Sequence, residues 1–388
     1  MKVYIGCFGS GLGHATRMLE IAKELDARGA ELEFSSSGEV ASLISKNGYR
    51  CNSIPLADVT YSDEGEFLVK ETILDSPSVV ARTSKQFVSE LANIGRFAPD
   101  AVLNDSALST SLAGKLLGIP TFTVLNQLNL TSSVEKQNAP SRVFSVGMSA
   151  GMGKLWELSD RVFFPDLPPP YTISEKNLWG HGLENTGYVG FITSRERSRP
   201  DAVAEEFAAG QRPKVFWQVS GPPKTRGAFL DAALKLGEAL SDEFSFVISG
   251  GDPRGSAEPR RLGRVWYYEW CGIADVYFKS CDVVVSRAGH GTIAQSILSS
   301  KPMLLVPIPR QPEQEGNAEK AARLGASITL QQSKVSAEAV RDSLRSLAGG
   351  AYRERAERLG EFASKFDARA AIVSAIESVA TAARLGPR

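Results

Sequence analysis

Continuous apolar runs alternate with stretches in which apolar residues recur every three or four positions along most of the chain. A continuous β-branched run is typical of a strand buried on both faces, and the longer spacing is typical of a helix with one buried face. Residues 3–8 form the first run, residues 15–28 carry a helical apolar stripe, and residues 31–35 form the second run. This strand–helix–strand order predicts an α/β protein with a parallel sheet.

The alternation continues and then restarts after a charged, proline-containing segment, which predicts two domains and a final helix. A chain of 388 residues is long enough for two domains of ordinary size. The predicted divisions are 1–192, 193–366 and 367–388. Further strands are expected at residues 97–105, 121–125, 188–190, 215–219 and 283–285, and further helices at residues 106–117, 292–300 and 367–384.

Composition narrows the class of protein. The 44 basic residues equal the 44 acidic residues, so nothing favours general nucleic-acid binding. The four cysteines show no CxxC spacing, which indicates a reducing compartment. No continuous apolar segment has the roughly 18 residues of a spanning helix, so we expect a soluble, cytoplasmic protein.

The stretch that follows residues 283–285 carries the first candidate chemistry. A small-residue turn leads from this strand into a helix, so free backbone N–H groups and the positive end of the helix point to one place. Arg287 adds a full charge there. The pattern therefore predicts an anion site. The alternative is an ordinary strand-to-helix turn of a doubly wound sheet, which has the same sequence pattern.

Polar residues also follow the next strand, which ends at Pro307. Glu313, Gln314 and Asn317 fall on the loop and helix start beyond it. In an open α/β sheet, ligands bind at the carboxyl ends of strands. An anion cradle and a polar cluster suited to hydroxyl groups are therefore expected side by side.

These two stretches resemble the nucleotide-sugar signature of GT-B glycosyltransferases, closest to the MurG-like group that makes lipid II and more distantly to the UDP-glycosyltransferases. The resemblance implies that the turn residues hold the donor diphosphate and that the polar residues after Pro307 hold the sugar. By this resemblance the diphosphate residues are Ser220, Gly221, Arg287, Gly289, His290, Gly291 and Thr292, and the sugar residues are Glu313, Gln314 and Asn317. It also implies that Trp270 and Cys271 border the nucleobase, although Trp270 fits a core position equally well. The family usually has glutamate on the ribose, where this chain has Gln295, which leaves UDP and dTDP both open.

The loop after the first strand resembles a dinucleotide motif but departs from it. In a GxGxxG pattern that begins at Gly9, the third glycine is replaced by His14, and no acid follows the second strand. The GT-B resemblance fits better, because its glycine loop matches Gly11 and Gly13 and places His14 facing the anomeric centre. An alternative is that His14 hydrogen-bonds only within its own turn.

Asp105 ends the strand at residues 97–105 on the ligand side. In related enzymes an aspartate at such a place holds the catalytic histidine, so the resemblance assigns Asp105 to His14. The alternative is a cap for the helix that follows.

The resemblance implies two facing Rossmann-like domains with an interdomain cleft, and a last helix that crosses back to the first domain. It implies an inverting hexosyl transfer from a UDP-sugar, with His14 as base, no cofactor and, since no Asp-x-Asp pair occurs, no metal. The acceptor is expected to be lipid-linked or small and hydrophobic, with its specificity in residues 54–91 and 127–156 and with peripheral contact at the cytoplasmic membrane face. A sugar-nucleotide epimerase and a non-catalytic nucleotide-sugar-binding module remain alternatives.

Overall fold

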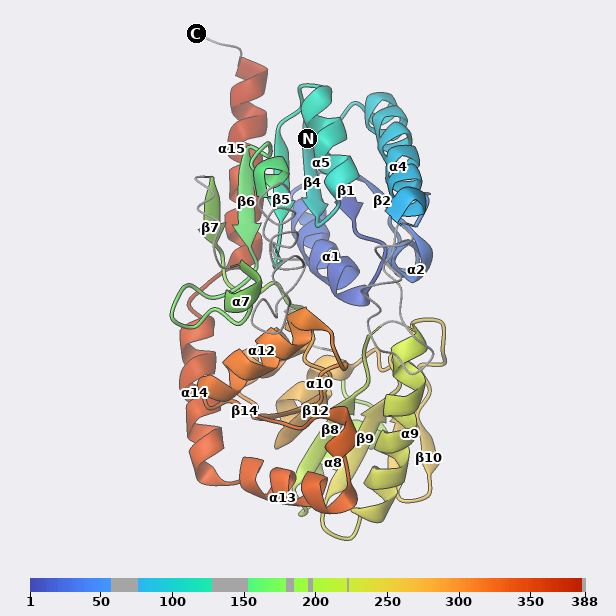
Figure 1. Cartoon of the computed structure of the whole chain (residues 1–388), viewed down its shortest axis with the longest axis vertical. Coiled ribbons are helices and arrows are strands. Elements are labelled where there is room, and N and C mark those ends of the chain that lie inside the picture. The colour runs from blue at the N-terminus through green and yellow to red at the C-terminus, as the bar shows by residue number, and fades with distance from the viewer. Residues whose placement is uncertain (57–75, 128–152, 179–184, 195–197, 222, 386–388) are drawn as a thin grey trace. The chain divides into compact units, whose positions relative to one another are not determined.

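The computed structural model describes residues 1–56, 76–127, 153–178, 185–194, 198–221 and 223–385 (Figure 1). Large parts of the predicted acceptor regions, residues 57–75 and 128–152, lie outside these ranges. Contacts divide the chain into two compact units: the described residues from Ser194 to Lys365 belong to unit 2, and the described residues before Ser194 and from Phe366 onward belong to unit 1. The divisions predicted after residues 192 and 366 each lie one residue from these boundaries.

Unit 1 is built on a sheet of seven parallel strands in the order β3-β2-β1-β4-β5-β6-β7. Its strands are β1 (Lys2–Cys7), β2 (Glu31–Ser36), β3 (Cys51–Ser53), β4 (Ala101–Asp105), β5 (Thr121–Val124), β6 (Arg161–Phe164) and β7 (Thr186–Tyr188). Its helices are α1 (Leu12–Ala27), α2 (Gly38–Lys46), α4 (Ser76–Phe97), α5 (Leu108–Leu116), α7 (Glu175–Leu178) and α15 (Ala368–Leu385).

Unit 2 repeats the plan with the strand order β10-β11-β9-β8-β12-β13-β14, in which only the pairing of β10 with β11 is antiparallel. Its strands are β8 (Lys214–Gln218), β9 (Ser245–Ser249), β10 (Arg260–Leu262), β11 (Val265–Tyr268), β12 (Val283–Ser286), β13 (Met303–Leu305) and β14 (Ser327–Thr329). Its helices are α8 (Ala202–Ala209), α9 (Pro223–Ala239), α10 (Ala274–Ser280), α11 (His290–Leu298), α12 (Pro312–Arg323), the 3-10 helix η2 (Gln332–Lys334), α13 (Ala337–Leu347) and α14 (Gly350–Ala363).

The last helix, α15, packs against α1 and so belongs to unit 1 (Figure 1). Two ion pairs join the helices: Arg28 to Glu377 at 2.8 Å and Arg369 to Glu20 at 3.4 Å. The chain therefore passes through unit 2 and returns. Among the described residues, no helix is both long and apolar enough to cross a bilayer.

The strands are buried as their composition predicts. All four residues of β12 are buried, because a central parallel strand is covered by helices on both faces. In β8, Trp217 is fully buried and packs on Phe229 of α9, with ring centroids 5.8 Å apart. This core fixes the ends of the strands from which the candidate site is built.

Some predicted boundaries were wrong. Helix α1 begins at Leu12 instead of residue 15, and α11 begins at His290 instead of residue 292. Both starts lie among glycines, whose weak helix propensity hid the first turn. The strand predicted for residues 97–105 begins only at Ala101, because Phe97 ends α4 and Ala98 turns the chain with a φ of 49°.

Candidate functional site

The loop between β1 and α1 presents the residues of unit 1 that the sequence singled out. Gly11 directly precedes α1 and has a φ of 86°, a backbone conformation that residues other than glycine rarely adopt. His14 therefore lies in the first turn of this helix. Gly13 has no described atom within 4 Å of the position where a Cβ would stand, so its missing side chain leaves open space next to His14.

Asp105 lies beside this loop because β1 and β4 are neighbours in the sheet. The register pairs Cys7 with Asp105, so the aspartate stands at the carboxyl edge where the glycine loop begins. His14 Nδ1 lies 2.7 Å from Asp105 Oδ1. A carboxylate only accepts hydrogen bonds, so Nδ1 must carry a proton, and in the neutral imidazole Nε2 then keeps its lone pair. The predicted pairing of these two residues is therefore present in the geometry.

The structure adds a residue that the sequence analysis missed. Arg17 is 4% exposed, and it donates to both carboxylate oxygens of Asp105: Nε to Oδ2 at 2.8 Å and Nη2 to Oδ1 at 3.0 Å. Its Nη2 also lies 3.1 Å from His14 Nδ1 and 3.3 Å from Asn126 Oδ1. The signal was a basic residue three positions after His14, which places both side chains on one helical face.

Asp105 is completely buried, and its charge state follows from its partners. Burial by itself raises the pKa of the Asp105 carboxyl, but Arg17 and His14 outweigh burial and hold that pKa well below its usual range. The carboxylate is therefore ionised at neutral pH. It is not a helix cap, because α5 has Ala107 at its N-cap and no side-chain capping bond.

In unit 2 the candidate residues follow the carboxyl ends of four parallel strands. Ser220 and Gly221 follow β8, Trp270 and Cys271 follow β11, the Arg287–Thr292 turn follows β12, and the residues on α12 follow β13. All four strands run in the same direction in one sheet, so their carboxyl ends lie along one edge. The sheet thus gathers onto one edge residues that are far apart in the sequence.

The start of α11 has the form expected of an anion site. Gly289 is the N-cap, and the first-turn amides of a helix have no partners within the helix. At both Gly289 and Gly291, no described atom lies within 4 Å of the position where a Cβ would stand, and neither glycine has a positive φ. Neither the backbone conformation nor the packing therefore requires glycine at these two positions. The absence of side chains there leaves space in which another group can approach the helix amides closely. His290, the first residue of α11, is buried.

Arg287 lies deeper than an exposed anion ligand would. It is 2% exposed, and its guanidinium donates to Val306 O at 3.2 Å, Gln332 Oε1 at 2.7 Å and Thr225 O at 3.3 Å. Its central carbon lies 4.2 Å from the centre of the Phe229 ring, and burial lowers its pKa to about 10. Arg287, which itself follows β12, therefore ties together the segments that follow β8, β13 and β14.

The residues of α12 are also partly engaged within unit 2. Asn317 is buried and donates from Nδ2 to Ala288 O at 3.2 Å, and Gln314 Oε1 accepts from Ile308 N at 3.0 Å. Glu313 is half-buried. Asn317 thus fixes the turn before α11, and Gln314 holds the loop after β13 with its oxygen, which leaves its amide nitrogen for other contacts.

The remaining candidates differ in burial. Trp270 and Gln295 are half-buried, and Cys271 is 6% exposed with its pKa raised to about 12 by burial. Trp270 is not among the buried core residues. Gly221 has a φ of +112°, and a Cβ there would meet Thr225 Oγ1 at 2.7 Å, so this turn needs glycine.

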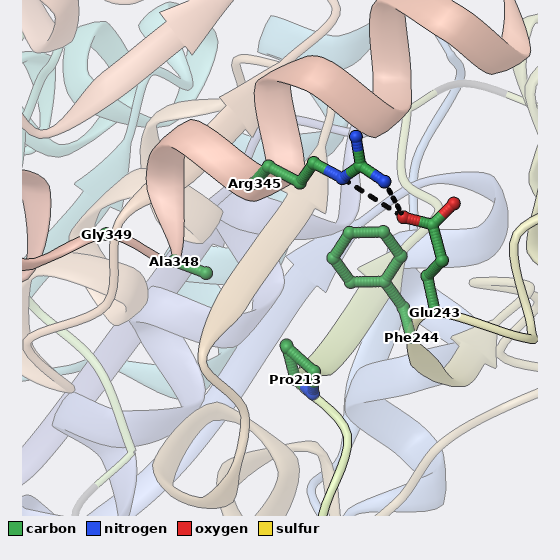
Figure 2. Close-up of a pocket in the computed structure, with 6 residues that line it drawn as sticks. All are labelled: Pro213, Glu243, Phe244, Arg345, Ala348 and Gly349. Carbon is green, nitrogen blue, oxygen red and sulfur yellow. Dashed lines mark hydrogen bonds and ion pairs between the residues drawn. The ribbon is translucent and has the colours of Figure 1, made fainter.

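A surface pocket of unit 2 lies at the other edge of the sheet (Figure 2). Its lining residues Pro213 and Phe244 immediately precede β8 and β9, and an ion pair between Glu243 and Arg345 crosses it. Ligands of such sheets bind at the carboxyl ends, so this pocket is not the candidate site. Within the described ranges, no group of three His, Cys, Asp or Glu side chains is arranged to hold a metal ion.

Two family models match the chain. "Glycosyl transferase family 1" matches residues 1–148, and "Glycosyltransferase family 28 C-terminal domain" matches residues 264–371. An uncharacterized glycosyltransferase of Methanosarcina mazei is 28% identical over 399 residues, which cover 98% of this chain and 99% of that protein. The UDP-N-acetylglucosamine–N-acetylmuramyl-(pentapeptide) pyrophosphoryl-undecaprenol N-acetylglucosamine transferase of Prochlorococcus marinus is 41% identical over 68 residues, 17% of this chain and 19% of that one.

Among solved structures, spinosyn rhamnosyltransferase SpnG complexed with thymidine diphosphate superposes with a TM-score of 0.70 at 17% identity, over 97% of this chain and 100% of that one. The two sheets of mostly parallel strands, each with interleaved helices, therefore match the GT-B fold, as the sequence predicted. With the family models and relatives, they identify the chain as a glycosyltransferase.

Proposed function

We propose that the protein is an inverting, metal-independent transferase that moves a hexose from a UDP-sugar to an acceptor hydroxyl. The observation that carries the proposal is the 2.7 Å contact between His14 Nδ1 and the buried Asp105 carboxylate. It leaves Nε2 of a partly exposed imidazole free to accept a proton. A nucleotide-binding module without catalysis has no need of such a pair.

His14 would act as the general base. Nε2 removes the proton from the acceptor hydroxyl while that oxygen attacks the anomeric carbon. The bond from this carbon to the diphosphate oxygen breaks, and attack from the opposite face inverts the configuration. The Asp105 carboxylate holds the imidazole in one tautomer and stabilises the imidazolium that forms.

Unit 2 would bind the donor. The leaving nucleoside diphosphate gains negative charge, which the first-turn amides of α11 are oriented to stabilise without a metal. Ser220 and Gly221 would contact the same phosphates. Arg287 would contribute its charge from beneath the turn, since its hydrogen bonds go to Val306, Gln332 and Thr225 of the surrounding segments.

The sugar and nucleoside would lie along the same edge of the sheet. Glu313 and the amide nitrogen of Gln314 would bind the hexose hydroxyls, and Asn317, which donates to Ala288 O, would support the turn between them and the phosphates. Trp270 would stack on the base, an interaction typically worth about 1–3 kcal/mol. Cys271 would lie beside it.

The relatives support the substrate classes. The Prochlorococcus enzyme is named for a UDP-sugar donor and a pyrophosphoryl-undecaprenol acceptor, and the SpnG structure contains thymidine diphosphate. We therefore assign a UDP-sugar as donor with dTDP as competitor, and a lipid-linked or small hydrophobic acceptor reached through peripheral membrane contact. No cofactor takes part.

Donor binding can be tested at Gly291. Replacing it by valine should abolish the thermal stabilisation by UDP, because the new side chain would fill the space that a diphosphate needs beside the α11 amides. A nucleotide at about 100 times its Kd stabilises the wild type by about 2.7 kcal/mol. Differential scanning fluorimetry with UDP, dTDP and ADP, with and without EDTA, measures this effect.

The control is the melting temperature of the variant without nucleotide. It should equal or exceed that of the wild type, because glycine is a poor helix former and no described atom lies within 4 Å of the position of the new Cβ. Undiminished UDP stabilisation in the valine variant would place the diphosphate elsewhere. Loss of wild-type stabilisation in EDTA would show that a metal takes part.

Gln295 should make the ribose contact weak. A neutral hydrogen bond contributes about 0.5–1.5 kcal/mol, against about 1.5–3 for one to a charged group. We therefore expect calorimetry to give UDP only about a fivefold advantage over dUDP, and Gln295→Glu to increase it. An advantage of a hundredfold in the unmutated protein would show that Gln295 is not the ribose contact.

A further inference from the structure

A third side chain, that of Arg17, contacts the pair formed by His14 and Asp105. Neither the family matches nor the relatives' names assign a role to this arginine. Arg17 comes from the same face of α1 as His14, and its guanidinium grips both oxygens of the Asp105 carboxylate. All three side chains meet at Asp105 Oδ1, which lies 2.7 Å from His14 Nδ1 and 3.0 Å from Arg17 Nη2. Asp105 Oδ1, which orients the proposed base His14, therefore also accepts a hydrogen bond from the permanently charged Arg17 guanidinium.

This arrangement changes the electrostatics of the imidazole. A carboxylate alone beside a histidine stabilises the protonated imidazolium, which cannot act as a base. A guanidinium cannot lose its proton in a protein, so Arg17 always contributes a positive charge. Its Nη2 lies 3.1 Å from the protonated ring nitrogen of His14, close enough to oppose a second positive charge there.

Among the residues that the structure describes, three other side chains that contact this cluster are uncharged. Cys7 on β1 pairs with Asp105 in the sheet, and burial raises the pKa of its thiol well above the usual range, so it stays neutral. Ser106 donates a hydroxyl to Asp105 Oδ1, and Asn126, just after β5, accepts from Arg17. None of these three side chains carries a charge.

We propose that Arg17 is a positioning residue that fixes the orientation of the Asp105 carboxylate and offsets its negative charge next to His14, so that His14 Nε2 is available to accept a proton. The inference rests on the proposed role of His14 as the base. Asp105 alone would orient the imidazole but would also hold it in the protonated form. The positive charge of Arg17 leaves this orientation in place and opposes the stabilisation of the protonated imidazole.

The test uses a reaction that needs no substrate. Diethyl pyrocarbonate acylates neutral imidazole, and the His14 side chain is 19% exposed, so mass spectrometry of the His14 peptide can follow its modification rate against pH. In Arg17→Gln the midpoint of this pH dependence should move up by about 1–3 pH units, the usual effect of an opposite charge at 4–6 Å. The acid limb of the kcat/KM profile should move with it, and turnover should recover at high pH.

Matched variants separate charge from packing. Arg17→Lys retains the charge, so the midpoint should stay near that of the wild type even if kcat falls. Lys23→Gln removes one positive charge from the surface of the same helix and should leave the midpoint and turnover unchanged. If Arg17→Gln does not fold, the double variant Arg17→Gln/Asp105→Asn, which removes both charges, should show the wild-type midpoint.

The outcomes distinguish this inference from the proposed function. An unmoved midpoint in folded Arg17→Gln, or a double variant whose midpoint differs from the wild type, would overturn the role of Arg17 whatever the enzyme's substrates are. Full turnover in His14→Ala would instead overturn the proposed base, and the modification midpoints would still report on Arg17. A uniform loss of turnover at every pH in Arg17→Gln, with the midpoint unmoved, would show a merely structural residue.

Discussion

Replacing His14 by alanine is expected to lower kcat by roughly 10²–10⁴, the usual contribution of a general base. The imidazole is the group that leaves a ring nitrogen free beside a buried carboxylate, and alanine supplies no substitute. Turnover would be followed as UDP release from a panel of UDP-hexoses in the presence of hydrophobic alcohols. Donor affinity, measured by calorimetry with UDP, should stay unchanged because the donor residues lie in unit 2.

Thr16→Ala is the matched control. Its side chain is in the same helical turn and bonds only the Gly13 carbonyl at an exposed position, so turnover should change by no more than about twofold. Turnover by His14→Ala at the wild-type rate would remove His14 from the mechanism. UDP-sugar conversion by the wild type without any acceptor would favour the epimerase instead.

Replacing Asp105 by asparagine should destabilise the protein by about 3–5 kcal/mol at neutral pH, because it leaves the buried Arg17 guanidinium without its counter-charge. The measurement is urea unfolding followed by circular dichroism. The folded-state pKa of Asp105 is depressed, so its stabilisation is present above the unfolded pKa of about 3.9 and is lost as the pH falls towards the folded value. The difference between wild type and variant should therefore shrink in acid.

Two variants check the cause. Glu31→Gln removes an exposed carboxylate 3.4 Å from Lys2 and should change stability by no more than about 1 kcal/mol. Arg17→Met/Asp105→Leu removes both buried charges and should recover most of the loss. If Asp105→Asn had the same free energy of unfolding as the wild type, the ion pair between Arg17 and Asp105 would not be formed in solution.

The alternation of apolar runs and helical stripes determined the strands and helices of both units. Val283 to Val285 had to be a strand covered on both faces, and the glycines after it had to form a turn, because burial and backbone freedom are local consequences of residue type. The same reasoning misplaced Phe97, since an apolar run does not reveal where a helix stops and a strand begins. The sequence also placed Asp105 at a strand end, where a ligand site was expected.

Tertiary structure alone decided which side chains those strand ends bring together. Asp105 pairs with His14, 91 residues away in sequence, because β1 and β4 are neighbours in the sheet, and no local pattern determines the strand order. No sequence pattern singled out Arg17, whose role as a partner of Asp105 follows from its burial, because a buried charge needs a counter-charge. Arg287 was expected to face an anion directly, yet it donates to residues that follow β8, β13 and β14, because a buried guanidinium needs several oxygens. Residue types determined the available chemistry, and the packing of distant segments decided the partners, since hydrogen bonds and charges act only over a few ångströms.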